Sequence, residues 1–370
     1  MTTQMPESQR AASLVILIPA RNEADMLAMT LEQLGTSVAP GDSVVVIDDG
    51  STDGTAEVAR QGGAQVCVRP TALGRCSTKG EALGWWATHP DRENEAHMGV
   101  VVLDADSLVG RNFCDQMRAR LLGGAAAAQS MVLPARVPCD PIGEIAAYSE
   151  LLEQKVADRL RGALGWPVRL RGTGMAFRRE VFLEAVAGLI TQVEDVELSL
   201  RLATRGVHVQ RVPEASVFDP KPPDNVVAAR QRARWLRGQL QVWWHYRSSI
   251  LRLAMRGPWA WSLLKSLLLK PRSLMAAAKA IGVGIVWALG SPAGSPLWIM
   301  MALLLVSLAG DLAFTCLGVS FLAGRRVLLR RGMYLAVYPL WWLAIVALAV
   351  RAPRGWLTGP RSIAHSSSSG

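Results

Sequence analysis

VVVLDAD (100–106) is the stretch of this 370-residue chain that decides the fold, because a continuous β-branched run leads directly into two carboxylates. Three similar runs precede it: LVILI (14–18), VVVI (44–47) and QVCV (65–68). Such runs are typical of parallel strands that are buried on both faces. Helical patterns separate them, at Ala24–Leu34, Gly54–Gln61 and Lys79–Thr88. The alternation predicts an α/β fold with a doubly wound, mostly parallel sheet that extends to about Val212.

Polar residues follow the ends of these runs, and ligands of doubly wound sheets bind beyond the carboxyl ends of the strands. The first run continues as PARNE (19–23) and the second as DDGSTDGT (48–55). The acids of the second segment are suited to hydrogen-bond a nucleoside. The same composition is also typical of an ordinary turn with a helix cap, so both interpretations stay open.

Asp104 and Asp106 follow the fourth run with a single residue between them. Residues i and i+2 of an extended chain share a face, so both carboxylates can point into one site. Mg²⁺ or Mn²⁺ is bound by such a pair together with substrate phosphates. Structural acids are the alternative, but the position at the end of a buried strand favours a metal site.

A second acidic pair, Glu194 and Asp195, opens the amphipathic segment VELSLRLATRG (196–206). Acids at this position stabilise the N-terminus of a helix through its dipole. Asp195 is also a candidate general base for a hydroxyl acceptor. The sequence alone does not decide between the two roles.

The basic segment AARQRARWLRG (228–238) contains Arg232, Arg234 and Trp235. Guanidinium groups bind diphosphate oxygens in a bidentate manner, and the indole offers an apolar face to a sugar ring. The alternative for this segment is a basic helix lying on anionic lipid.

Charge is unevenly distributed along the chain. The chain has 40 Lys and Arg against 30 Asp and Glu, but residues 251–370 contain 13 basic residues and one acid, Asp311. A basic pI is typical of nucleic-acid-binding proteins, yet this excess lies in the most apolar third and therefore indicates a membrane surface. The five cysteines show no C-x-x-C spacing and indicate reduced thiols in a cytosolic setting. The histidines are scattered along the chain, so no zinc site is expected.

The C-terminal third predicts a membrane region. A tryptophan-rich amphipathic stretch at 241–272 is expected to lie in the membrane interface. Three apolar segments follow and are expected to span the bilayer, at 273–290, 297–323 and 333–350, before a tail at 351–370. Four arginines in GRRVLLRRG (324–332) place that connector and the N-terminal domain in the cytoplasm. Asp311 is expected to pair with Lys279 or to face a partner subunit.

Seven motifs occur in the order found in one enzyme family: PARNE, DDGSTDGT, KGEAL, DAD, GTGMAFRRE, VED and QRARW. They resemble the membrane-integrated glycosyltransferases of family 2, which include cellulose, chitin, hyaluronan and poly-N-acetylglucosamine synthases and ceramide glucosyltransferase. The resemblance covers roughly residues 13–240. It implies a GT-A fold for residues 1–240, a nucleotide-sugar donor (a UDP-sugar above all), a Mg²⁺ or Mn²⁺ cofactor and inversion at the anomeric carbon.

The resemblance also implies roles for individual residues. The donor would be bound by Pro19, Ala20, Glu23, Asp48, Asp49, Lys79, Asp104 and Arg234. The diphosphate and acceptor would be bordered by Gly174, Gln231, Arg232 and Trp235. Asp106, with Asp104, would hold the metal. Asp195, beside Glu194, would deprotonate the acceptor hydroxyl.

The acceptor stays open at this stage. A growing polysaccharide at the inner face of the cytoplasmic membrane is one class, and a lipid or lipid-linked sugar is the other. A non-catalytic subunit of an export complex is disfavoured, because Asp106, Asp195 and Arg234 are all present. The expected partners are membrane lipid, a second copy of the chain or an export protein. Three departures from the family pattern concern the acceptor: Val193 stands in place of Thr, Thr173 in place of Asn, and KGEALG (79–84) in place of K-A-G-A-L-N.

Overall fold

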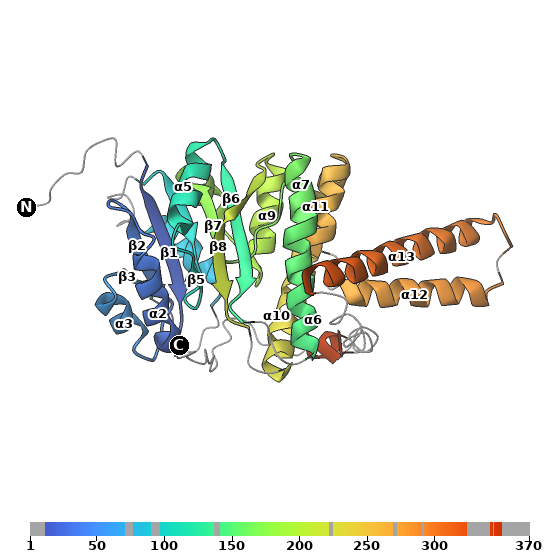
Figure 1. Cartoon of the computed structure of the whole chain (residues 1–370), viewed down its shortest axis with the longest axis horizontal. Helices are drawn as coiled ribbons and strands as arrows, with labels where there is room; N and C mark the ends of the chain where they lie inside the picture. The colour runs from blue at the N-terminus through green and yellow to red at the C-terminus, as the bar shows by residue number, and fades with distance from the viewer. Residues whose placement is uncertain are drawn as a thin grey trace, which may run out of the picture.

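The computed structural model describes residues 12–70, 77–89, 97–136, 141–221, 225–268, 272–290, 292–323, 341–342 and 344–349. One eight-stranded sheet organises the N-terminal part, with the strand order β3-β2-β1-β4-β7-β6-β8-β5. Helices cover both faces of this sheet (Figure 1). The predicted α/β class is therefore confirmed.

The first half of the sheet is parallel and contains the predicted strands. They are β1 (Leu14–Ala20), β2 (Ser43–Asp48), β3 (Gln65–Val68) and β4 (Gly99–Val102). The helices between them are α2 (Ala24–Gly35), α3 (Thr55–Gln61) and α4 (Lys79–Thr88), as the helical patterns predicted. Burial on both faces was wrong for β3, because β3 is an edge strand and leaves Val68 exposed.

The second half of the sheet is mixed. Its strands are β5 (Leu108–Val109), β6 (Ala127–Pro134), β7 (Met175–Arg178) and β8 (Val209–Asp219). β7 lies antiparallel between β4 and β6, whereas β6 and β8 are parallel and β5 and β8 are antiparallel. A register shift interrupts the pairing of β6 with β8 between Ser130 and Met131. The sheet is thus less uniformly parallel than expected.

Helices of the second half cover the sheet and reach the site. They are α5 (Phe113–Leu122), α6 (Pro141–Leu152), the π-helix η2 (Glu153–Ala157), α7 (Asp158–Ala163), α8 (Arg179–Val186) and α9 (Glu194–Thr204). The π-turn joins α6 directly to α7, and single π-turns of this kind are frequent at functional sites. Gln154 of η2 hydrogen-bonds both backbone groups of Val132, just beyond the register shift of β6. The π-helix therefore satisfies backbone groups of β6 beyond Gln129, the last residue of β6 that pairs with β7.

Two hydrophobic clusters hold the sheet between its helices. One contains Ile16, Ile18 and Phe113 on the α2 and α5 side, and the other contains Leu17 and Phe182 on the α4 and α8 side. Alternate residues of β1 thus face opposite layers, as expected of a strand that is buried on both faces.

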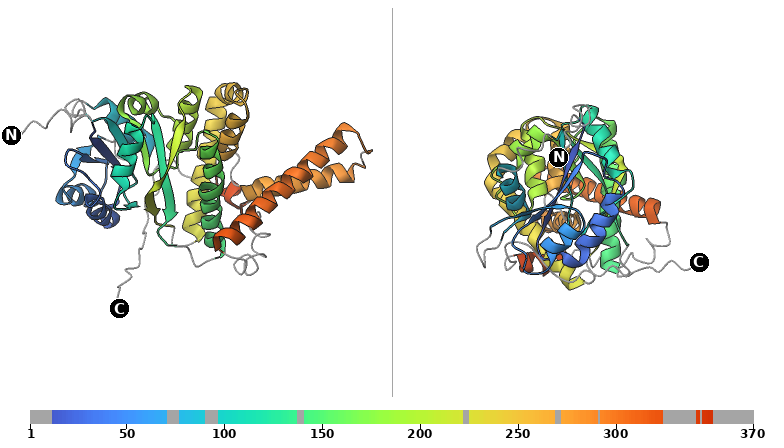
Figure 2. Two further views of the ribbon diagram at one scale, coloured as in Figure 1. Left: turned by 45° about the horizontal axis from the view of Figure 1, so that its top comes forward. Right: turned by 90° about the vertical axis from the view of Figure 1, so that its left-hand side faces the viewer.

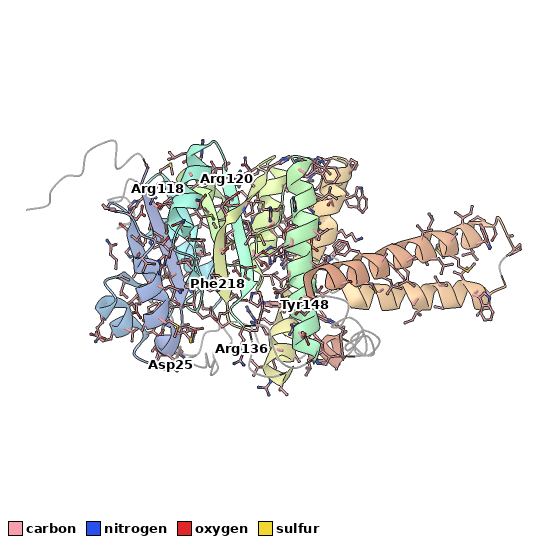
Figure 3. The ribbon with its side chains drawn as sticks, viewed as in Figure 1. Asp25, Arg118, Arg120, Arg136, Tyr148 and Phe218 are labelled. Carbon is pink, nitrogen blue, oxygen red and sulfur yellow. The ribbon has the colours of Figure 1, made fainter. Side chains whose placement is uncertain are left out.

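The two ends of the sheet differ. Arg118 of α5 hydrogen-bonds the carbonyl of Ala12 and pairs with Asp42, which places it where β1 and β2 begin. Asp25, at the start of α2, lies at the opposite end, where β1 finishes (Figure 3). The carboxyl ends of the parallel strands are therefore at the Asp25 end, and the motifs that follow these strands gather there.

Two long helices follow the sheet. α10 (Asn225–Ala254) runs without interruption through residue 240 and is followed by α11 (Pro258–Leu268). They pack on α9 through a cluster that includes Val196, Val242 and Leu263. Figures 1 and 2 show α6, α7, α10 and α11 together beyond the β6–β8 side of the sheet.

A helical hairpin extends away from this body. α12 (Arg272–Ala288) and α13 (Pro296–Ala323) lie side by side, and one end of α13 packs against α6 (Figures 1 and 2). Lys279 of α12 pairs with Asp311 of α13 and donates a hydrogen bond to Ser307 (2.7 Å). The expected Lys279–Asp311 pair is thus present, and Lys265 of α11 joins it at 3.4 Å.

Within the described residues, one helix is long and apolar enough to cross a membrane. It is the segment Pro296–Phe314 of α13, with a mean hydropathy of 2.1. The apolar part of α12, Ala278–Ala288, is shorter. Of the third expected span, 333–350, only residues 341–342 and 344–349 are described, so its length is not tested. Three membrane spans were expected, and among the described residues one helix has the length and composition of a span.

Candidate active site

The loops after β1 and β2 interlock. Asn22 adopts a left-handed backbone (φ 54°), which lets its side-chain oxygen accept from the N–H of Thr52 at 2.7 Å while its own N–H donates to Ser51 at 3.0 Å. The N–H of Glu23 donates to the hydroxyl of Thr55 at 3.0 Å. Pro19 and Ala20 are buried at the end of β1 immediately before this loop. The PARNE and DDGSTDGT segments therefore form one rigid edge of the site.

Asp48 and Asp49 are both buried, and each is engaged inside the protein. Asp48 accepts from the N–H of Ser51 at 2.8 Å. Asp49 accepts from Arg69 at 2.7 Å and from the hydroxyl of Ser77. The geometry places both acids at the expected edge, where Asp49 also fixes the chain that leads into α4.

Lys79 is the centre of the charged site. Its ammonium contacts the carboxylate of Asp104, donates to the carbonyl of Gly172 at 2.8 Å and lies 3.6 Å from Glu194. Burial alone would lower the pKa of Lys79, but Asp104, Glu194 and Asp195 outweigh it and raise the pKa. Lys79 therefore stays charged and joins the ends of β4 and α9.

Thr173 explains one departure from the family pattern. Its hydroxyl accepts from the N–H of Asp104 at 3.1 Å and lies 2.8 Å from the hydroxyl of Ser107. Gly172 and Gly174 on either side have positive φ angles of 84° and 62°. The buried threonine thus connects the G-T-G loop to the D-A-D loop through its hydroxyl group. A threonine can therefore make this connection at the position where the family usually has asparagine.

Glu194 and Asp195 occupy the first turn of α9, as the sequence predicted. Burial raises the pKa of Glu194 to about 7; Lys79 opposes the shift, whereas Asp195 and Asp104 add to it. A buried carboxyl group whose pKa is raised towards neutrality is typical of acid–base sites. Glu194 is therefore about half protonated at pH 7.

Two glycines that sequence reasoning missed let the site helices approach closely. A β-carbon at Gly80 of α4 would lie 3.3 Å from the Cβ of Glu194. One at Gly238 of α10 would lie 2.7 Å from a methyl group of Val193. Val193 is buried, which explains why an apolar residue precedes the Glu-Asp pair here. In the sequence, Gly238 is marked only by its position directly after QRARWLR (231–237).

A buried clamp, also missed from the sequence, fixes α9 against α10. Glu197 is fully buried and accepts from the N–H of Thr191 (2.8 Å), from Arg201 (2.7 Å) and from the hydroxyl of Tyr246 (2.5 Å). Arg201 also donates to the carbonyls of the loop that precedes the Glu-Asp pair, with 2.6 Å to Ala187. The clamp therefore holds the position of the first turn of α9.

The QRARW residues lie on α10 with different partners. Arg234 reaches the carbonyl of Gln192, just before the Glu-Asp pair, at 3.5 Å. Arg232 is buried, stacks on the ring of Trp341 (5.1 Å from guanidinium carbon to ring centroid) and donates to the carbonyl of Ala228 at 3.3 Å. Trp235 packs against the α9–α11 cluster, and Gln231 is half-buried. The structure thus brings Arg234 to the acidic turn, while Arg232 faces an aromatic ring.

The D-A-D residues differ in exposure. Asp106 is buried, and the side chain of Asp104 is 35% exposed. The chain described here contains no group of three or more His, Cys, Asp or Glu residues arranged to hold a metal. Two carboxylates at the end of β4 are therefore what the described residues offer to a cation.

Known proteins resemble this chain in sequence and in fold. A curated protein of Bacillus subtilis (strain 168), named probable glycosyltransferase YdaM, is 24% identical over 241 residues, which are 61% of this chain. The chain spans about half (55%) of the length of that relative. A solved mannosyltransferase of Pyrobaculum calidifontis, in complex with GDP-Man and Mn²⁺, is 19% identical, with a TM-score of 0.50 over 92% of this chain and 85% of that one.

The similarity to the solved structure supports the α/β GT-A-like fold of the sheet domain. The family match is carried by the sequence itself. Residues 11–238, which contain all seven motifs, match the family described as glycosyltransferase like family 2. The chain belongs to glycosyltransferase family 2.

Proposed function

We propose that this protein transfers a sugar from a nucleotide-diphosphate sugar, a UDP-sugar above all, to a hydroxyl group with inversion at the anomeric carbon. One observation carries the proposal. Lys79 joins Asp104, from the metal-binding motif, to Glu194, in the turn that holds the candidate base. Donor and base residues from distant parts of the sequence therefore converge on one ammonium group.

The donor side is suited to a divalent cation. Asp104 and Asp106 present carboxylate oxygens, the ligand type that Mg²⁺ and Mn²⁺ prefer, and diphosphate oxygens and water complete such a site. The partial exposure of Asp104 leaves its carboxylate accessible. Bound there, the cation would supply charge stabilisation to the leaving diphosphate. Lys79 adds a fixed positive charge on the same side.

The acceptor side provides the base. The acceptor oxygen forms a bond to the anomeric carbon, and the bond from that carbon to the diphosphate oxygen breaks with its electron pair leaving on the diphosphate. The acceptor proton passes to the carboxylate of Asp195. Glu194, whose pKa burial raises to about 7, lies beside Asp195 in the same turn and can exchange a proton near neutral pH. Arg234 stands at this turn and is placed to contact the diphosphate.

We infer that the protein associates with a membrane, which favours an acceptor at a lipid surface. α10, α11 and the turn between them expose Trp244 (72%), Met255 (79%) and Trp261 (62%) beside Arg247 and other basic residues. This composition is typical of helices in the membrane interface. We infer that the α12–α13 hairpin enters the cytoplasmic membrane of a bacterial-type cell as part of a multi-pass region, with the sheet domain in the cytoplasm. The arginine-rich connector 324–332 supports this orientation.

Two acceptor classes fit a transferase at this surface. One is a growing polysaccharide, which would be extended repeatedly. The other is a lipid or lipid-linked sugar, which would be modified once. Incubation of purified protein with a panel of nucleotide sugars, followed by product sizing, separates them, because a ladder indicates polymer and a single addition indicates a lipid.

Asp195→Asn tests the proposed reaction directly. Nucleoside diphosphate release in the presence of acceptor should fall at least 10²-fold while donor binding persists, because Asn keeps the shape of the side chain but accepts no proton. Asp115→Asn, which changes an exposed side chain of α5, is the matched control. Equal loss of donor binding and of transfer would remove Asp195 from the role of base.

A further inference from the structure

Four arginines surround two buried carboxylates beside the candidate base, and the mechanism above uses none of them. The arginines belong to α7, to the segment 166–171 and to β8: Arg161, Arg169, Arg171 and Arg211. The carboxylates are those of Glu153 in η2 and Asp158 in α7. Arg161 and Arg171 contact these carboxylates, and the charges of Arg169 and Arg211 interact with that of Asp158.

The two carboxylates are already neutralised by two of the arginines. Arg161 binds Glu153 at 2.8 Å and Asp158 at 2.6 Å. Arg171 binds the other oxygen of Asp158. Within the described ranges, Arg169 and Arg211 have no carboxylate within salt-bridge distance. Among these six side chains the arginines thus outnumber the carboxylates by two, and the negative charges of Asp195 and Glu214 also act on Arg169 and Arg211, respectively.

The excess of arginines is accompanied by polar atoms without partners. The Nε atoms of Arg169 and Arg211 and the hydroxyl of Ser266 are buried and have no hydrogen-bond partner among the described residues. Ser266 belongs to α11, is 2% exposed, and its carbonyl accepts from Arg169 at 3.4 Å. Burial lowers the pKa of Arg169, and Arg171 lowers it further. Native proteins rarely leave buried donors unsatisfied, so such a group indicates a bound polar species.

The cluster is tied to the candidate base. The hydroxyl of Ser199 accepts from the N–H of Leu170 (2.9 Å) and donates to the carbonyl of Asp195 (2.7 Å). Arg169 and Arg171 flank Leu170 in the same extended segment, and the negative charge of Asp195 acts on Arg169. The cluster is thus anchored at the base, whereas the donor-side contacts of Lys79 are made to Asp104 and Gly172.

We propose that Arg169, Arg211 and Ser266 form an anion subsite that binds a phosphate group carried by the acceptor. This assignment rests on the proposed transfer reaction and deepens it, because it names the acceptor as a phosphate ester with a free hydroxyl. The phosphate oxygens would accept from the orphaned donors and offset the positive charges of Arg169 and Arg211. Arg161 and Arg169 also contact α11, which exposes Trp261, so the subsite adjoins the surface proposed to face lipid.

The first test is direct binding of inorganic phosphate to the full-length protein in detergent with EDTA present. Phosphate should raise the melting temperature of wild-type protein, and Arg169→Met and Arg211→Met should each weaken the phosphate midpoint at least tenfold. Arg60→Met, an exposed arginine of α3, is the control and should behave as wild type. Equal phosphate midpoints in wild type, Arg169→Met and Arg211→Met would overturn the proposal.

The second test uses acceptor pairs that differ only in phosphate. Glycerol 3-phosphate is compared with glycerol in solution, and phosphatidylglycerol with diacylglycerol in phosphatidylcholine nanodiscs. The phosphate-bearing member of one pair should accelerate nucleoside diphosphate release, and the pair that responds identifies a soluble or a lipid source. Arg169→Met should raise the KM of that acceptor at least tenfold more than the KM of the phosphate-free member of the pair, and Arg169→Lys should recover part of the loss.

The outcomes separate this subsite from the proposed function. If Arg169→Met slows donor hydrolysis and neutral acceptors as much as phosphate-bearing ones, Arg169 only positions Asp195 and the anion subsite is wrong. Acceleration by the neutral members alone also overturns it. If instead wild-type protein hydrolyses and transfers no nucleotide sugar at all, the transferase proposal fails, while phosphate binding by Arg169 and Arg211 still stands on the first test.

Discussion

Glu194→Gln should remove a pH-dependent loss of stability. The pKa of Glu194 is about 7 in the folded protein and 4.5 as the reference for an unfolded chain, because the side chain is buried among Lys79, Asp195 and Asp104. Between these two values the folded state keeps a proton that the unfolded state has lost. The free energy of unfolding therefore falls as pH rises from about 4.5 to 7 and is flat above that range.

The magnitude follows from the size of the shift. Each pKa unit corresponds to about 1.4 kcal/mol, so the raised pKa of Glu194 costs about 3 kcal/mol at pH 8. Glutamine mimics the protonated acid at every pH. The variant should therefore match wild type near pH 4.5 and exceed it by about 3 kcal/mol at pH 8. For a domain of some 240 residues, this corresponds to a melting temperature about 6 °C higher.

Equilibrium urea unfolding of the full chain in detergent, followed by tryptophan fluorescence at several values between pH 5 and 8, measures this difference. The difference between variant and wild type cancels the groups that lie far from Glu194 and leaves Glu194 together with its charged neighbours Lys79, Asp104 and Asp195. Glu184→Gln, an exposed residue of α8, should show no pH-dependent difference. A constant gap between wild type and Glu194→Gln across this range would refute the argument from burial.

Three further predictions concern other parts of the molecule. Glu197→Ala should lower the free energy of unfolding by about 3–5 kcal/mol, because Arg201 loses its buried partner. Tyr246→Phe should lower it by only about 1 kcal/mol. Urea unfolding measures both changes. Asp311→Asn and Lys279→Met should each reduce thermal stability, and a double-mutant cycle should give a coupling of about 0.5–3 kcal/mol, with zero coupling arguing against the hairpin ion pair. EDTA should abolish nucleoside diphosphate release in an enzyme assay, and added Mn²⁺ should restore it; full activity in EDTA would exclude a divalent cofactor.

The elements that were predicted correctly have local signals. The β-branched runs became β1, β2, β3 and β4, and the acid-led amphipathic pattern became α9. Each depends on a few consecutive residues and their periodicity, which tertiary contacts seldom override in a long, regular segment. The positions of the acids after these strands followed, because the ends of parallel strands meet at one edge.

The features that were missed depend on residues far apart in the sequence. β7 enters the sheet antiparallel, between strands that precede it in the chain, and no local pattern specifies that pairing. Glu197 and Arg201 resemble an ordinary surface i, i+4 pair on a helix. Their burial comes from Tyr246, 49 residues beyond Glu197, and only the folded chain reveals it. The stacking of Arg232 on Trp341, more than a hundred residues away, has no local signal either, and its expected place beside the diphosphate stays a prediction.

One short segment connects the donor and acceptor ends of the site. Residues 169–174 carry the proposed anion subsite at Arg169 and accept Lys79 at the carbonyl of Gly172. Thr173 then fixes the backbone of Asp104. The positive φ angles of the two glycines allow the chain to turn sharply here, so that successive residues face opposite ends of the site. Backbone substitutions in this segment, unlike the side-chain change Arg169→Met, should therefore disturb the contacts of Asp104 and of Arg169 together.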